Sequence, residues 1–254
     1  MKWTRALEDY RLYLRLERGL SDNSIQNYSL DVHKLINFLD VNSIKLSPLD
    51  ISEETIQQFI YEMAKSLNPR SRARLISGLR GFFNFLVFED YRKGNPLDLI
   101  EAPKTGRKLP DVISTEEIDR LISAIDLGKA EGERNRAILE TLYGCGLRVS
   151  ELVNLQISDL FFEEGFIKVT GKGNKQRLVP ISFYTQKYSN IYLKEISPQL
   201  HIKKEATDTL ILNRRGNKLT RTMIFNIIQQ ISVKDGNDKQ KIPHTLSQSS
   251  YTHL

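Results

Sequence analysis

The sequence predicts a mainly α-helical protein with a small antiparallel β-sheet, an α+β fold class in two domains. Three observations predict it. Apolar residues recur at helical spacing through residues 1–100, a polar segment containing two prolines follows at 101–110, and short β-prone runs appear between residues 160 and 181. We therefore expect a helical domain over 1–100, a linker over 101–110 and a mixed domain over 111–254.

Four amphipathic helices are expected in the first domain. The first stops near Gly19 and carries apolar side chains at Trp3, Leu7, Tyr10, Leu14 and Leu16. The second spans 21–40, and the third follows Ser52 as its N-cap. The fourth starts near Ser71, and Asn95-Pro96 is expected to close it because the residue before a proline disfavours helical backbone. Four helices with short connections predict a bundle.

The second domain is expected to begin near Leu109 and to combine helices with the sheet. Ser114 and Glu117 have the spacing of a capping box at the start of a helix. Two β-prone runs, 166–170 and 177–181, are joined by a Gly/Asn/Lys turn and predict an antiparallel pair. Further helices are predicted over 133–143, 149–155, 183–196 and 220–231.

Composition and charge narrow the class of function. No segment approaches the roughly 20 consecutive apolar residues that span a membrane, and the start MKWTRALEDY does not resemble a secretory signal. The single cysteine, Cys145, excludes an internal disulfide and a cysteine-based zinc cluster. A cytoplasmic protein without membrane contact is expected. The net charge of +6, concentrated after residue 200, is compatible with a nucleic-acid partner without proving one.

Several ordered segments carry the functional signal. They are GCGLRVSEL at 144–152, GKGNKQRLVP at 171–180, RGNKLTR at 215–221, PHTL at 243–246, and, in the first domain, SIQNY at 24–28 and SRARL at 71–75. In this order and spacing they resemble the tyrosine recombinase (phage integrase) family, in an Xer-like form, over essentially the whole chain. The resemblance implies a helical core-binding (SAM-like) domain followed by a catalytic domain.

The resemblance also implies a chemistry for which these residue types are suited. In the family a tyrosine attacks a DNA phosphodiester and forms a 3′-phosphotyrosyl link, so rejoining needs no ATP, metal or other cofactor. Arg148 would clamp the scissile phosphate because a guanidinium donates two hydrogen bonds and stays charged, and Glu151 would support it. Lys172 would protonate the departing 5′-oxygen, and His244 would hydrogen-bond the phosphate or assist proton transfer. The alternatives are an exposed ion-paired arginine, a solvated hairpin lysine and a structural histidine.

The expected partner is double-stranded DNA, with other recombinase subunits as further partners on that DNA. The residues expected to contact it are Arg72, Arg74, Arg80, Lys175, Arg177, Thr220 and Arg221. Phosphate contacts of this kind supply affinity and make it salt-dependent. For the arginines of the first domain, an ordinary solvated helix face is the alternative.

The sequence departs from the family after Leu246. Ser247 stands where the family has its second catalytic arginine, and Gln248 where it usually has a histidine. The nucleophilic tyrosine is expected to be missing, and Tyr251 lies where another side chain normally packs. We expect a truncated or frameshifted copy, with a naturally catalysis-free module that occupies recombination sites as the alternative. Both chromosome-dimer resolution and mobile-element integration stay open, as does a helical protein–protein adaptor.

Overall fold

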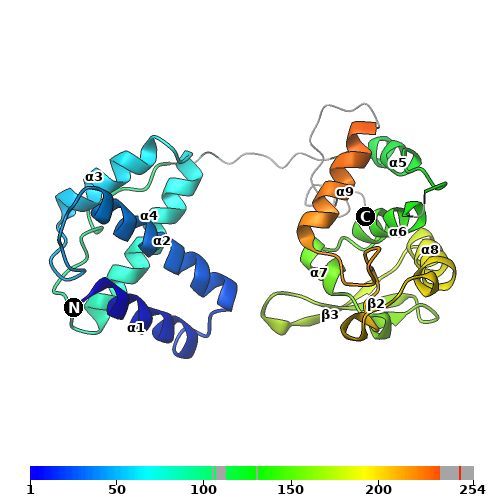
Figure 1. Cartoon of the computed structure of the whole chain (residues 1–254), viewed down its shortest axis with the longest axis horizontal. Helices are drawn as coiled ribbons and strands as arrows, with labels where there is room; N and C mark the ends of the chain where they lie inside the picture. Colours follow the sequence, from blue (N-terminus) through cyan, green and yellow to red (C-terminus); the bar gives the residue numbers. More distant parts are fainter. Residues whose placement is uncertain (105, 107–112, 130, 235–245, 247–254) are drawn as a thin grey trace. The chain divides into compact units, whose positions relative to one another are not determined.

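The four helices of the first domain form as the apolar periodicity predicts (Figure 1). They are α1 (Trp3–Leu16), α2 (Asp22–Val41), α3 (Glu53–Ala64) and α4 (Pro69–Phe88). The computed structural model describes residues 1–104, 106, 113–129, 131–234 and 246, except for the side chain of Lys172. These residues fall into two units, Met1–Lys108 and Leu109–Leu254. His244, Ser247 and Tyr251 lie outside the described residues.

The end of α4 differs from the prediction. The helix ends at Phe88 rather than at Asn95-Pro96, because Asp90 takes a left-handed backbone conformation with φ 57°. The Asn95 carboxamide then donates to the carbonyl of Arg80 at 3.1 Å and to Asn84 Oδ1 at 2.7 Å. The segment after the helix is therefore held against α4, and the proline only limits how far the helix could have continued.

Aromatic side chains dominate the core of the first unit. Tyr10, Phe59, Phe82 and Phe83 are at most 2% exposed, and the rings of Tyr10 and Phe82 meet edge to face with centroids 5.3 Å apart. Leu16, which the helical spacing places with the apolar side chains of α1, is instead 76% exposed. The four helices nevertheless form one bundle, because α2 packs along α4 and both α1 and α3 contact α4.

The second unit combines a small sheet with several helices. The sheet has the order β1 (Leu160–Phe161), β2 (Phe166–Thr170), β3 (Gln176–Pro180), and both pairings are antiparallel. The helices are α5 (Thr115–Ser123), α6 (Gly132–Gly144), α7 (Val149–Asn154), α8 (Phe183–Ile191) and α9 (Arg221–Lys234). The fold class predicted from the sequence is thus confirmed.

The helices of the second unit also follow the sequence closely. The capping box of α5 is present, with the Ser114 hydroxyl accepting from the Glu117 N–H at 3.2 Å and the Glu117 carboxylate accepting from the Ser114 N–H at 3.1 Å. The helix predicted over 183–196 changes at Tyr192 into a short π-helix, Tyr192–Ile196. The buried Tyr192 hydroxyl accepts the Leu212 N–H at 3.1 Å, so this turn ties the helix to a later loop.

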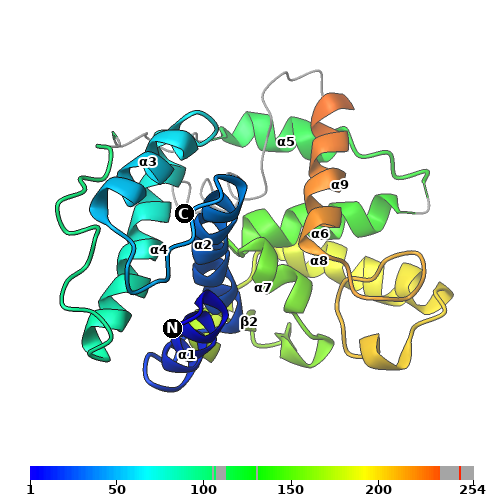
Figure 2. The ribbon, with the colours of Figure 1, turned by 60° about the vertical axis from the view of Figure 1, so that its left-hand side comes forward.

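The close approach of α6 and α8 requires a glycine. A Cβ on Gly144 would overlap Thr185 Oγ1 and would lie 2.9 Å from Ser182 Oγ. The Thr185 hydroxyl donates to the carbonyl of Glu140 at 2.9 Å. This packing fixes the end of α6, from which the GCGLRVSEL segment continues (Figure 2).

The described part of the chain has neither a membrane-spanning helix nor a metal-binding cluster. None of its helices has the length and apolar character needed to cross a membrane. Nor does that part contain a group of three or more His, Cys, Asp or Glu side chains placed to hold a metal ion.

Candidate functional site

A tight turn between α6 and α7 presents Arg148 to solvent. Gly146 takes a left-handed conformation with φ 57°, which reverses the chain directly after α6. The next residue, Leu147, is fully buried, whereas the side chain of Arg148 is 63% exposed. The turn is therefore anchored by Leu147 and holds a guanidinium at the surface immediately before α7.

The carboxylate of Glu151 organises this guanidinium from below. The side chain of Glu151 is 3% exposed, and one of its oxygens accepts the Arg148 N–H at 2.8 Å while the other accepts from Arg148 Nη1 at 3.0 Å. The same two oxygens accept from Nη1 and Nη2 of Arg177 at 2.8 and 2.9 Å. Glu151 therefore joins Arg148, three residues before it, to Arg177, 26 residues after it.

The electrostatics of Glu151 follow from these contacts. Burial raises the pKa of the carboxyl, but the hydrogen bonds from Arg177 and from the Arg148 backbone and side chain outweigh it. The net effect is a lowered pKa, so Glu151 is a carboxylate at neutral pH. The cluster carries two guanidinium charges against one carboxylate charge and is therefore suited to an anion.

The hairpin between β2 and β3 reaches the same cluster. A Cβ on Gly171 would lie 3.3 Å from both Arg177 Nη1 and Glu151 Oε1, so a glycine leaves room for the ion pair. The hairpin closes through the Gly171 N–H, which donates to the Lys175 carbonyl at 2.8 Å. Lys172 follows Gly171 in a turn, Lys172–Asn174, with left-handed backbone at Gly173 and Asn174. The backbone of Lys172 thus adjoins the pair that holds Arg148.

The other predicted residues of the second unit have different positions. Lys175 is exposed, and Arg177 is 36% exposed but committed to Glu151, a pairing that the sequence prediction missed. The strand register places Arg177 opposite Val169, which a motif match does not reveal. Thr220 directly precedes α9, and its hydroxyl accepts the Met223 N–H at 3.2 Å. The exposed Arg221 follows as the first residue of that helix.

The three arginines predicted on α4 differ in their contacts. Arg74 donates through Nη2 to the buried Asp31, and its side chain is 50% exposed. Arg80 donates through Nη2 to the carbonyls of Leu97 and Ile100 at 3.2 and 2.8 Å, which holds the segment after α4 in place. Arg72 is half-buried. Only Arg74 therefore combines an anchored guanidinium with large exposure.

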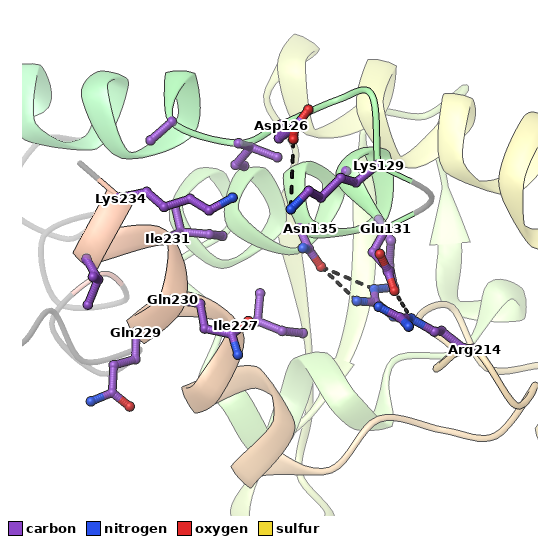
Figure 3. A pocket seen from close by; sticks show the side chains of 15 residues that line it. Asp126, Lys129, Glu131, Asn135, Arg214, Ile227, Gln229, Gln230, Ile231 and Lys234 are labelled. Atoms are coloured by element: carbon purple, nitrogen blue, oxygen red, sulfur yellow. Dashed lines mark hydrogen bonds and ion pairs between the residues drawn. The ribbon is translucent and has the colours of Figure 1, made fainter. Parts of the chain in front are cut away.

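A cavity of about 580 Å³ lies elsewhere in the second unit, between the C-terminal half of α9 and the residues before α6 (Figure 3). Its charged groups face one another. Lys129 Nζ is 4.0 Å from Asp126 Oδ2, and Arg214 pairs with Glu131. No lining residue belongs to 144–152 or 171–180, so the cavity is separate from the Arg148 cluster.

Cys145 lies inside the turn that carries Arg148. Its side chain is 5% exposed, and burial raises the pKa of the thiol to about 12 despite a hydrogen bond with Thr185. A thiol with this pKa is protonated and unreactive at neutral pH. Cys145 therefore acts as a small packing residue.

Comparison with known proteins covers both units. Residues 111–254 match the phage integrase family, and residues 7–90 match the phage integrase N-terminal SAM-like domain. The tyrosine recombinase XerD of Staphylococcus saprophyticus subsp. saprophyticus is 41% identical over 250 residues, covering 98% of this chain and 84% of that protein. XerD of Listeria monocytogenes serovar 1/2a is 36% identical over 249 residues, with the same coverage of 98% and 84%. A solved structure of the XerH site-specific recombinase bound to a palindromic difH substrate shares the fold, with a TM-score of 0.75, 23% identity and coverage of 98% of this chain and 72% of that one.

Proposed function

The chain belongs to the tyrosine recombinase (phage integrase) family, and from this premise we propose that it binds duplex DNA at recombination sites and places a phosphodiester against Arg148. The observation that carries the proposal is the Glu151 cluster. It brings together the two segments that resemble the family's arginine and lysine motifs, 144–152 and 171–180. Such a cluster of cations beside an exposed hairpin is suited to a phosphate.

Each residue of the cluster has a distinct role in this proposal. Arg148 is held through Nη1, so its remaining N–H groups are available for the non-bridging phosphate oxygens. A donor of this kind contributes about 3–4 kcal/mol to a charged transition state. Arg177 positions Glu151, and Lys172 on the hairpin turn supplies the proton for the departing 5′-oxygen. His244 would complete the phosphate contacts.

The remaining predicted residues would bind the DNA backbone. Lys175 and Arg221 are exposed cations, and Thr220 lies at the N-terminus of α9, where backbone N–H groups favour an anion. In the helical domain, proposed for 1–100, Arg72 and Arg74 would add phosphate contacts. The catalytic domain is proposed for 111–254. Affinity is then expected to fall steeply with salt.

The 254-residue polypeptide is proposed to perform the binding step without the covalent step. Ser247 has neither the charge nor the planar fork of an arginine, and Tyr251 lies only seven residues after His244, where the family packs another side chain. Two functions are compatible with this step, that of a recombinase family member and that of a catalysis-free module that occupies recombination sites. In both cases it binds DNA, and other recombinase subunits would be its partners there.

Fluorescence anisotropy with a short fluorescein-labelled duplex of mixed sequence tests the binding proposal. Arg148→Gln is compared with Arg120→Gln, which removes the same charge from the exposed face of α5, outside the motifs. Loss of a charge-assisted phosphate contact weakens binding about 10- to 100-fold for Arg148→Gln. Arg120→Gln should leave the affinity nearly unchanged. If the wild-type chain fails to bind duplex DNA at low salt, the proposal is wrong and a protein–protein adaptor is favoured.

A further inference from the structure

A carboxylate is fully buried between two helices of the first unit. Asp31 lies on α2, is 0% exposed, and packs against α4. The pKa of its carboxyl is raised, because the effect of burial outweighs the opposing effects of Arg74 and Lys34. A buried ion pair of this kind contributes little net stability, because desolvation of the charges offsets their attraction. We therefore expect the Asp31 carboxylate to have a role other than stabilising the fold.

The packing around Asp31 is specific to this carboxylate. A Cβ on Gly78 of α4 would overlap Asp31 Oδ2 and lie 3.1 Å from its Cγ, so the glycine provides the space that the carboxylate occupies. Oδ2 has no hydrogen-bond partner among the described residues. Oδ1 accepts from Arg74 Nη2 and lies 3.8 Å from Lys34 Nζ. The carboxylate is thus directed at the cations through a single oxygen.

Arg74 extends from this buried anchor to the surface. Its side chain is 50% exposed although Nη2 is bound at the base, which leaves further guanidinium N–H groups facing outward. A free arginine loses rotamer freedom when it binds a phosphate, and an arginine already held in place loses less. We propose that Asp31 is a positioning residue that holds the Arg74 guanidinium ready for a DNA phosphate. This inference rests on the proposed duplex binding.

The direction of the effect separates positioning from simple electrostatics. Asp31→Asn removes a negative charge beside the proposed DNA contact, so charge alone would tighten binding to a polyanion. Positioning predicts the opposite, a weakening of about 3- to 10-fold that corresponds to the ordering of one long side chain. Asp22→Asn is the matched control, because it makes the same charge change at an exposed site on the same helix. It should leave binding unchanged or slightly tighter.

The test is a salt-dependent anisotropy titration of the full chain with the mixed-sequence duplex. Asp31→Asn should weaken binding in the wild-type background but should no longer weaken it in an Arg74→Gln background, where only the slight tightening from the lost charge remains. Arg74→Lys keeps the charge but loses the planar fork, and it should also weaken binding, whether or not Asp31→Asn folds. Trp3 fluorescence reports folding of the first unit in each variant.

The outcomes distinguish the two proposals. If the wild-type chain does not bind the duplex, the proposed function fails. If the wild-type chain binds but Asp31→Asn binds as tightly or more tightly, or Arg74→Lys equals the wild type, the positioning role is wrong and duplex binding stands. If Asp31→Asn weakens binding equally with and without Arg74, the effect does not pass through the guanidinium and the inference is also overturned.

Discussion

Replacing Glu151 with glutamine tests how the Arg148 cluster is held together. The glutamine side chain has the same shape but one acceptor oxygen, and its amide group would turn donors toward the guanidinium of Arg177 or of Arg148. Removing one member of a buried ion pair costs about 3–5 kcal/mol. The side chains of the two arginines are 36% and 63% exposed and can turn to water, so we expect a smaller loss of about 2–3 kcal/mol in the unfolding free energy of the second unit.

The dependence on pH has a defined sign. The pKa of Glu151 is lowered in the folded state, so its stabilisation is fully present above the unfolded pKa of about 4.3 and is lost as the pH falls through the folded pKa. Glutamine does not titrate. The stability difference between the wild type and Glu151→Gln should therefore shrink as the pH is lowered below about 4.

The chain provides separate probes for its two units. The single tryptophan, Trp3, lies in the first unit, and the single cysteine, Cys145, lies buried in the second. Thiol labelling of Cys145 at increasing urea concentration should show a lower unfolding midpoint for Glu151→Gln than for the wild type. The unfolding midpoint followed by Trp3 fluorescence should stay the same. Glu164→Gln, at an exposed turn, should change stability by no more than about 0.5 kcal/mol. An unchanged labelling midpoint for Glu151→Gln at neutral pH, or a stability difference followed by circular dichroism that grows in acid, would refute the reasoning.

Three further predictions follow from buried or fixed groups. Without denaturant, Cys145 should resist iodoacetamide at pH 8, because burial raises the pKa of its thiol to about 12; stoichiometric labelling of the native chain would contradict this. Gly216→Ala should destabilise the second unit more than Gly165→Ala does, since both have a positive φ but only at Gly216 would a Cβ overlap the His201 carbonyl; thermal melts that rank them in reverse would disprove it. The left-handed backbone alone costs about 1–2 kcal/mol at Gly165. Arg74→Gln should reduce the steepness of the fall of log affinity with log salt by about 1. Arg80→Gln should instead lower the urea midpoint of Trp3 fluorescence, because Arg80 bonds to backbone carbonyls. The same salt slope for Arg74→Gln and the wild type would contradict the assignment of Arg74.

Much of the fold could be predicted because local signals and packing agree. The capping box at Ser114 and Glu117 identifies a helix start, and the two β-prone runs joined by a Gly/Asn/Lys turn identify the β2–β3 hairpin, each without reference to the rest of the chain. The end of α4 could not be predicted in this way. It depends on Asp90 in a left-handed conformation and on Asn95 bonding back to the helix, contacts that no periodicity encodes.

In the candidate site, too, local features could be predicted from the sequence and tertiary contacts could not. The position of Arg148 before α7 follows from the motif, since a glycine-rich turn and a buried leucine precede it. The pairing of Arg177 with Glu151 requires the strand register, and the commitment of Arg80 to backbone carbonyls requires the path of residues 95–100. A sequence motif identifies which residues are charged, but tertiary contacts decide which of those charges remain free for a ligand.

We propose that this polypeptide binds duplex DNA through the Arg148 cluster without forming a covalent link. The most direct test is incubation with a nicked suicide duplex, with one sample run on both a native and a denaturing gel. We predict a retarded band on the native gel that is lost with Arg148→Gln, and no protein–DNA adduct on the denaturing gel. An adduct that disappears with Tyr251→Phe would contradict the account, because Tyr251 would then be the nucleophile.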